Sequence, residues 1–140
     1  MSLFLHFFLI YHDMMFLVII MQYIIYEYQK QYRDLFARYP HLEDSLSHLK
    51  EDNSYCRALK STLYHDLSFL DQLVYDKLQH RQEYVKKGHL HILYHPLTGQ
   101  KSTFLIKNNK IYIHSLNKNN IFFYIIYQNL KYYVIIEKKL

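Results

Sequence analysis

Residues 3–26 read LFLHFFLIYHDMMFLVIIMQYIIY, and the way this stretch folds decides the class of protein. As a helix rising about 1.5 Å per residue, these 24 residues are long enough to cross a hydrocarbon core about 30 Å thick. Asp13 near mid-membrane costs about 2.5–3.5 kcal/mol, whereas 14 Leu, Ile, Phe and Val residues each favour insertion by about 0.3–0.6 kcal/mol. The stretch therefore predicts a transmembrane helix that contacts the lipid bilayer.

Two other interpretations of residues 3–26 stay open. A buried core helix would be interrupted at His12 and Asp13, and a cleaved signal peptide lacks both a basic start and a small-residue cleavage site. Basic residues follow the stretch, beginning at Lys30, and none precedes it. The positive-inside rule then predicts a single-pass membrane protein whose C-terminal side is cytoplasmic.

Charge is distributed unevenly along the chain. Residues 1–29 contain no Lys or Arg, residues 30–100 carry 10 basic and 9 acidic residues, and residues 101–140 carry seven Lys and one Glu. The formal net charge of +5 thus arises at the C-terminal end. We expect three parts: a membrane anchor over 1–29, a helical region over 30–88 and a β-rich basic tail over 89–140.

The composition excludes several classes of protein. A length of 140 residues allows one small domain or two very small ones. The single cysteine excludes an intramolecular disulfide framework and a cysteine-based zinc site. Two glycines cannot build a glycine-rich phosphate loop, which removes ordinary P-loop and Rossmann nucleotide binding. We expect a non-enzymatic protein without a cofactor.

Residues 41–87 contain no Gly or Pro, and leucines recur there at helical spacing. A heptad series over residues 42–84 is apolar at nine of 13 positions, which is typical of a coiled coil, whereas a period near 3.6 fits packing on a local neighbour. Residues 51–54, Glu-Asp-Asn-Ser, favour caps and turns. We favour an antiparallel helical pair, 41–50 and 54–87, over one long helix.

The helical region offers an apolar face to a protein partner or to a second copy of the chain. The residues of this interaction face are Leu42, Leu46, Leu49, Leu63, Leu67, Leu70 and Val74. Together with the anchor, this face predicts a membrane-anchored accessory or scaffold protein that acts through protein–protein interaction.

From residue 89 the pattern becomes that of short strands separated by turns. Turn signals occur at residues 96–99 and at the dipeptide Asn108-Asn109. The expected strands lie at 89–95, 102–107, 110–116, 121–128 and 132–137. The fold class predicted for the whole chain is α+β: an N-terminal transmembrane helix, a helical hairpin or coiled coil, and a small antiparallel β-meander.

The tail has two interpretations. A real meander must pack on a partner, because an isolated small sheet is only marginally stable, and the nearest candidate is the helical face over residues 63–74. Alternatively, Ile, Phe, Lys, Asn and Tyr make up 29 of residues 101–140, and their A- and T-rich codons fit translation of AT-rich DNA outside the natural reading frame. Residues 30–100 would then form the whole functional unit.

Histidines are the weak candidates for a metal site. His89, His91 and His95 share one face of a strand, because side chains alternate with period two. His89 and His91 are close enough to share an ion, but His95 lies too far along a flat strand, and no nearby carboxylate offers a general base. We therefore expect no metal site and ordinary exposed strand histidines.

The alternative function is that of a small soluble, basic α+β domain that binds nucleic acid. The chain contains 16 Tyr and 9 Phe, and bases stack readily on aromatic side chains. The tail contains no Arg, however, and the RNA-binding consensus of basic residue, Gly and aromatic residue is absent. Nucleic acid is therefore the less favoured partner, and it requires cations gathered on one sheet face. The residues resemble no known family.

Overall fold

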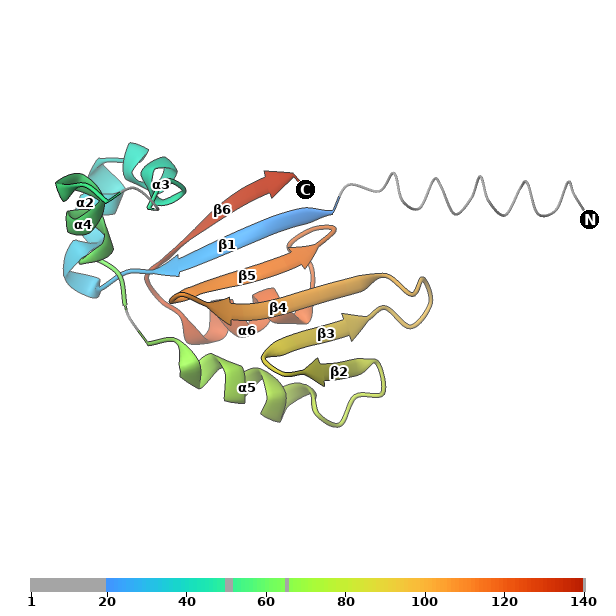
Figure 1. Ribbon diagram of the computed structural model, residues 1–140. Helices are drawn as coiled ribbons and strands as arrows, with labels where there is room; N and C mark the ends of the chain where they lie inside the picture. Colours follow the sequence, from blue (N-terminus) through green and yellow to red (C-terminus); the bar gives the residue numbers. More distant parts are fainter. Residues whose placement is uncertain (1–19, 50–51, 65, 140) are drawn as a thin grey trace, which may run out of the picture.

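The computed structural model describes residues 20–49, 52–64 and 66–139, and an antiparallel sheet lies at its centre (Figure 1). Its six strands are β1 (Met21–Glu27), β2 (Tyr84–Lys87), β3 (Leu90–Tyr94), β4 (Lys101–Lys107), β5 (Lys110–Ser115) and β6 (Tyr133–Lys139). Their order is β2-β3-β4-β5-β1-β6. The protein is α+β, as predicted, and β1 from the beginning of the chain pairs with two strands of its C-terminal tail.

Tight turns arrange β2 to β5 as a meander. Gly88 and Gly99, between neighbouring strands, have φ values of 62° and 70°, a left-handed conformation that glycine adopts without steric cost. Between β4 and β5, Asn108 and Asn109 both have positive φ, 54° and 60°, as a type I′ hairpin requires. The predicted hairpin at Asn108-Asn109 is confirmed.

Helices α5 (Ser68–Leu78) and α6 (Ile121–Asn129) cover one face of the sheet (Figure 1). The buried residues that they contribute are Leu70, Val74, Leu78, Phe122, Phe123, Ile125 and Ile126. These side chains form one cluster with Phe104, Ile111 and Ile113 of the sheet. Burying one such side chain stabilises the fold by about 1.5–3 kcal/mol, so the contact between α5 and the tail is a major source of stability.

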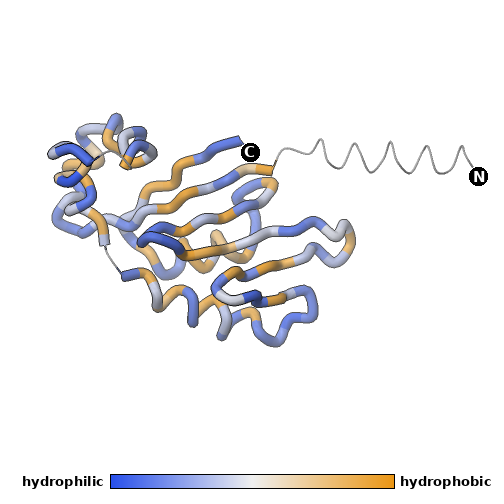
Figure 2. The backbone as a smooth tube through the Cα atoms, viewed as in Figure 1, coloured by the Kyte–Doolittle hydropathy of each residue, from blue (hydrophilic) through white to orange (hydrophobic). Residues whose placement is uncertain are grey.

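In the described part of the chain, the opposite face of the sheet is covered at one end only. The short helices there are η1 (Lys30–Tyr32), α2 (Arg33–Arg38), α3 (His41–Leu46) and α4 (Ser54–Lys60). They pack on Ile24 and Tyr26 of β1 and on Val134 of β6. Figure 1 shows this helical group beside the end of β1 and the start of β6, and Figure 2 shows β6 becoming hydrophilic towards its C-terminal end. None of the other described helices covers the remainder of this face.

The transmembrane helix predicted over residues 3–26 is wrong where the structure describes it, because its end forms strand β1; residues 3–19 lie outside the described residues. Tyr23 to Tyr26 are all buried, and a strand buried on both faces reads as a continuous apolar run. Over the described ranges, no helix has the length and hydrophobicity needed to cross a membrane. This finding contradicts the predicted single-pass membrane location with a cytoplasmic C-terminal side.

Two further predictions of local structure need correction. The chain does break near residues 51–54, where the Asn53 side chain accepts a hydrogen bond from the Cys56 backbone N–H at 2.8 Å and caps α4. However, residues 54–87 form α4, α5 and β2 rather than one helix, and no coiled coil runs through the described residues. Residues 121–128, expected as a strand, belong to α6, whose first turn is capped by the Asn120 side chain.

Candidate functional site

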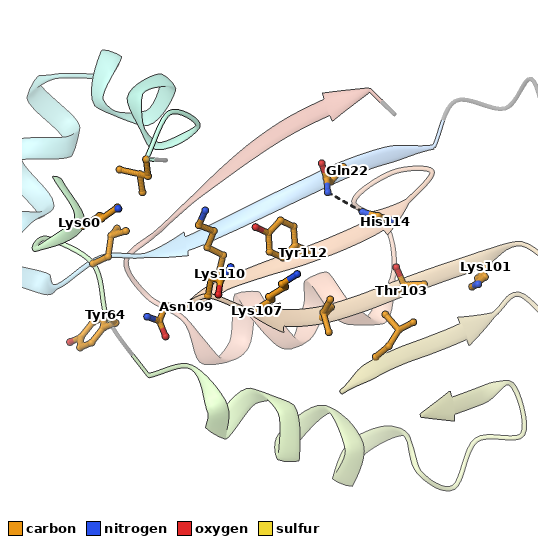
Figure 3. A pocket seen from close by; sticks show the side chains of 15 residues that line it. Gln22, Lys60, Tyr64, Lys101, Thr103, Lys107, Asn109, Lys110, Tyr112 and His114 are labelled. Atoms are coloured by element: carbon orange, nitrogen blue, oxygen red, sulfur yellow. Dashed lines mark hydrogen bonds between the residues drawn. The ribbon is translucent and has the colours of Figure 1, made fainter. Parts of the chain in front are cut away.

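The open part of the sheet is hollowed into a groove of about 880 Å³ (Figure 3). Its floor is formed by strands β1, β3, β4 and β5, and one wall is formed by the end of α4 and the residues after it, including Leu63 and Tyr64. Tyr64 is 43% exposed at this wall. The groove exists because α2 to α4 cover only one end of this face.

Strand alternation places the floor residues. Along β5, Ile111, Ile113 and Ser115 are buried on the helix-covered face, so the intervening residues point to the groove. The half-buried floor residues are Gln22, Leu90, Thr103, Leu105, Lys110, Tyr112 and His114. The floor thus combines an aromatic ring and aliphatic side chains with amide, hydroxyl and imidazole groups.

Four lysines surround this floor: Lys60, Lys101, Lys107 and Lys110. Among the described residues that line the groove there is no Asp or Glu. Lys107 and Lys110 lie directly opposite each other in the β4–β5 pairing, where like charges destabilise a sheet. The described lining of the groove therefore carries four cations and no carboxylate.

Lys110 is held where the groove meets the helical group. Its Nζ lies 5.5 Å from the centre of the Tyr26 ring, within the range of a cation–π contact. The Tyr26 hydroxyl donates a hydrogen bond to the Leu46 carbonyl oxygen at 3.0 Å, and burial raises the pKa of Tyr26 to about 12. Tyr26 is therefore a neutral, fixed support for the cation.

Gln22 and His114 form a polar pair on the floor. They lie opposite each other in the β1–β5 register, and the Gln22 Nε2 and His114 Nε2 atoms are 3.1 Å apart. Burial lowers the pKa of His114 below its usual value, so the ring is neutral at pH 7 and accepts from the Gln22 amide. The pair offers hydrogen-bonding groups to a ligand in the groove.

A second polar cluster lies under α5, on the other face of the sheet. The His91 side chain is 0% exposed; its Nδ1 lies 2.6 Å from the Tyr84 hydroxyl and its Nε2 lies 2.6 Å from Asp71 Oδ1. Burial lowers the pKa of His91, although Asp71 opposes that shift. The neutral ring accepts a hydrogen bond from Tyr84 and donates one to Asp71, which ties β2 and β3 to α5.

Of the three weak metal candidates, His89 and His91 lie beside the same carboxylate, that of Asp71, and His95 is apart. The expectations that no carboxylate lies nearby and that these histidines are all exposed are therefore wrong. His91 is buried in the cluster just described, whereas His89 is 83% exposed with Nδ1 3.6 Å from Asp71 Oδ2. His95 accepts backbone hydrogen bonds from Leu97 and Thr98 in the β3–β4 turn. Within the described part of the chain, no three His, Cys, Asp or Glu residues are grouped to hold a metal ion.

The seven residues predicted as an interaction face lie in the interior. Leu42, Leu46, Leu49 and Leu63 pack in the cluster beneath the short helices, and Leu67, Leu70 and Val74 pack in the main core. Each is at most 8% exposed. Leu49 and Leu63 also line the groove, whereas a partner would reach the other five only if the helices moved away from the sheet. Their role in protein binding stays a prediction.

The sequence analysis required cations on one sheet face for its alternative function, but it did not identify which lysines would gather there. The signal was present as period-two spacing, with Lys101, Thr103, Leu105 and Lys107 on one face of β4 and Lys110, Tyr112 and His114 on one face of β5. No known family model matches the chain, and no curated protein matches it.

Proposed function

We propose that the protein is a nucleic-acid-binding domain and that its ligand lies in the groove on the open sheet face. The observation that carries this function is the set of four lysines around a groove whose described lining contains no carboxylate. Lysine neutralises phosphate as a point charge, and the release of condensed counterions drives such binding. We propose that this site binds a ligand, and we propose no chemical reaction there.

Nucleic acid fits the groove better than an acidic peptide does. A peptide that adds to a sheet needs a strand with unpaired backbone groups, but β4, β5 and β1 are paired on both sides. The sheet edges are β2 and β6. Aromatic rings beside the lysines, Tyr64 at the wall and Tyr112 on the floor, instead suit the flat faces of bases.

The salt dependence of binding follows from the number of lysines. Each phosphate neutralised on a single strand contributes about −0.7 to the slope of log affinity against log salt concentration. Four contacts give a slope of about −2.8, which weakens binding about 50-fold between 50 and 200 mM salt. An uncharged ligand held by the floor alone would show almost no such dependence.

Fluorescence anisotropy with the full chain and a labelled oligonucleotide tests the assignment. We expect Lys107→Gln/Lys110→Gln to weaken binding and to reduce the salt slope by about 1.4, because two phosphate contacts are lost. Lys77→Gln is the control, since Lys77 is exposed on α5, on the covered side of the sheet. Equal effects of the groove and control variants, or no salt-dependent binding, would reject the proposed function.

A competitor separates nucleic acid from other polyanions. Polyglutamate carries a similar charge density but has no bases, so we expect it to displace the oligonucleotide only at much higher charge concentration. Equal competition per charge would reassign the groove to acidic protein segments.

A further inference from the structure

Tyr112 occupies the middle of the groove floor. In Figure 3 its ring points into the groove from β5, between the side chains of Lys110 and His114. Its cross-strand partners in the sheet are Leu105 on β4 and Ile24 on β1, both apolar. The ring therefore has aliphatic neighbours on both sides and hydrogen-bonding or charged groups along its own strand.

Residues two apart on one strand face are about 7 Å apart, so Lys110 and the Gln22–His114 pair lie within one nucleotide's reach of the Tyr112 ring. A cation at that distance can contact the phosphate of a nucleotide whose base rests on the ring. The amide and imidazole groups can contact the base edge. These three contact types meet at one point of the floor.

We propose that the groove is selective for single-stranded nucleic acid and that an unpaired base stacks on Tyr112 beside the Gln22–His114 pair. This inference rests on the proposed nucleic-acid-binding function of the same groove. In a duplex both faces of each base are covered by its neighbours, so a duplex offers this floor only its phosphates. A single strand can turn a base out and add stacking to the lysine contacts.

Electrostatics alone would favour the opposite ligand. A duplex carries a higher charge density, and each phosphate contact contributes about −0.9 to its salt slope against about −0.7 for a single strand. A purely basic surface of four lysines therefore binds duplex at least as tightly as single strand at low salt. Preference for the single strand is evidence for a contact that only unpaired bases make.

The test compares a labelled single strand with the duplex of the same sequence, using the full chain. We expect the single strand to bind at least about fivefold more tightly, because stacking of one base is worth at least that factor. We expect a strand with abasic sites throughout to lose this advantage. The inference would be overturned if the duplex bound as tightly as the single strand, or if the normal and abasic strands bound equally. Salt-dependent binding in either case would leave the proposed nucleic-acid-binding function intact.

Substitution of the ring gives an independent test. We expect Tyr112→Leu to weaken single-strand binding at least about fivefold with little change in the salt slope, and Tyr112→Phe to retain more affinity than Tyr112→Leu. Tyr124→Leu, on α6, is the matched control, because Tyr124 is 48% exposed and lies on the covered side of the sheet. Unchanged affinity of folded Tyr112→Leu would overturn the inference; should that variant unfold, the abasic strand decides.

Discussion

Replacing Asp71 by Ala should destabilise the protein by removing the end of a buried chain of hydrogen bonds. In this chain the Tyr84 hydroxyl donates to His91 Nδ1, and His91 Nε2–H donates to Asp71 Oδ1, each at 2.6 Å. The variant leaves the His91 N–H without its partner in a site where the side chain is 0% exposed. Lys86, whose Nζ lies 3.4 Å from Asp71 Oδ2, loses the same carboxylate.

The expected loss follows from two contributions. Removing the acceptor of a buried hydrogen bond to a charged group leaves its donor unpaired, and the whole change costs about 1.5–3 kcal/mol. The partly exposed ion pair with Lys86 adds at most about 1 kcal/mol. A net loss of about 2 kcal/mol is a large share of the 5–15 kcal/mol that stabilises a typical domain, and it lowers Tm by about 7 °C for a chain of this size.

Thermal and urea denaturation followed by circular dichroism measure this change. Asp76→Ala is the matched control on the same helix, because Asp76 is exposed and its carboxylate accepts a hydrogen bond from the exposed Gln72 side chain. Its expected effect is below about 0.5 kcal/mol. Asp71→Asn keeps an oxygen acceptor and should fall between the two. If Asp71→Ala is as stable as Asp76→Ala, the buried chain does not stabilise the fold.

Three shorter predictions concern titration, a helix cap and a turn. Burial lowers the pKa of His91 and of His114, so the unfolded chain binds more protons than the folded chain as the pH falls through about 6.5. The free energy of unfolding should therefore decrease on acidification, by at most about 1.36 kcal/mol per pH unit for each histidine. Urea melts between pH 8 and pH 5 measure this decrease. Asn120→Ala should cost about 1 kcal/mol in the same assay, because its side chain accepts from two backbone N–H groups at the start of α6, and Asn120→Ser should recover most of that loss. Asn109→Ala should cost about 1 kcal/mol, since φ is 60° there, whereas Asn109→Gly should melt at or above the wild-type temperature.

Local turn chemistry was the most reliable signal in the sequence. The Asn108-Asn109 dipeptide and the turn at residues 96–99 both lie between strands, close to the predicted positions. Such turns depend on the left-handed tolerance of Asn and Gly, which is a property of those residues themselves. The break near Asn53 was predictable for the same reason, because Asn favours helix caps.

Two continuous apolar runs were predicted with the wrong secondary structure. Residues 21–26 were expected to be helical and form a strand, and residues 121–128 were expected to be a strand and form a helix. Periodicity cannot separate a buried strand from a buried helix when nearly every residue is apolar. The distinguishing signal for α6 was Asn120, which caps its start, and the burial of β1 depends on strands more than 80 residues away.

The groove could not be found from charge counts. The excess of lysine in residues 101–140 was visible, but its grouping depends on the pairing of β4 with β5 and on Lys60 arriving from α4. The open part of the sheet face depends on the short helices covering one end of that face. A site built from the register of several strands is a property of the assembled sheet.

Removal of residues 101–140 should abolish cooperative unfolding of the remaining chain. These residues supply β4, β5, α6 and β6, so their loss leaves β1 without either neighbour and β3 without one. They also supply nine of the buried apolar side chains, from Phe104 to Val134. At about 1.5–3 kcal/mol each, these outweigh the net stability of a typical domain.

Circular dichroism melts that compare the chain of residues 1–100 with that of residues 1–140 test this prediction. We expect no sigmoidal transition in the shortened chain and binding of a hydrophobic dye, because Leu67, Leu70 and Val74 lose the sheet on which they pack. Had the tail been only the translation of AT-rich sequence, the two forms would melt at the same temperature. Equal midpoints would therefore refute the packing of α5 on the tail, and with it the sheet face on which the groove lies.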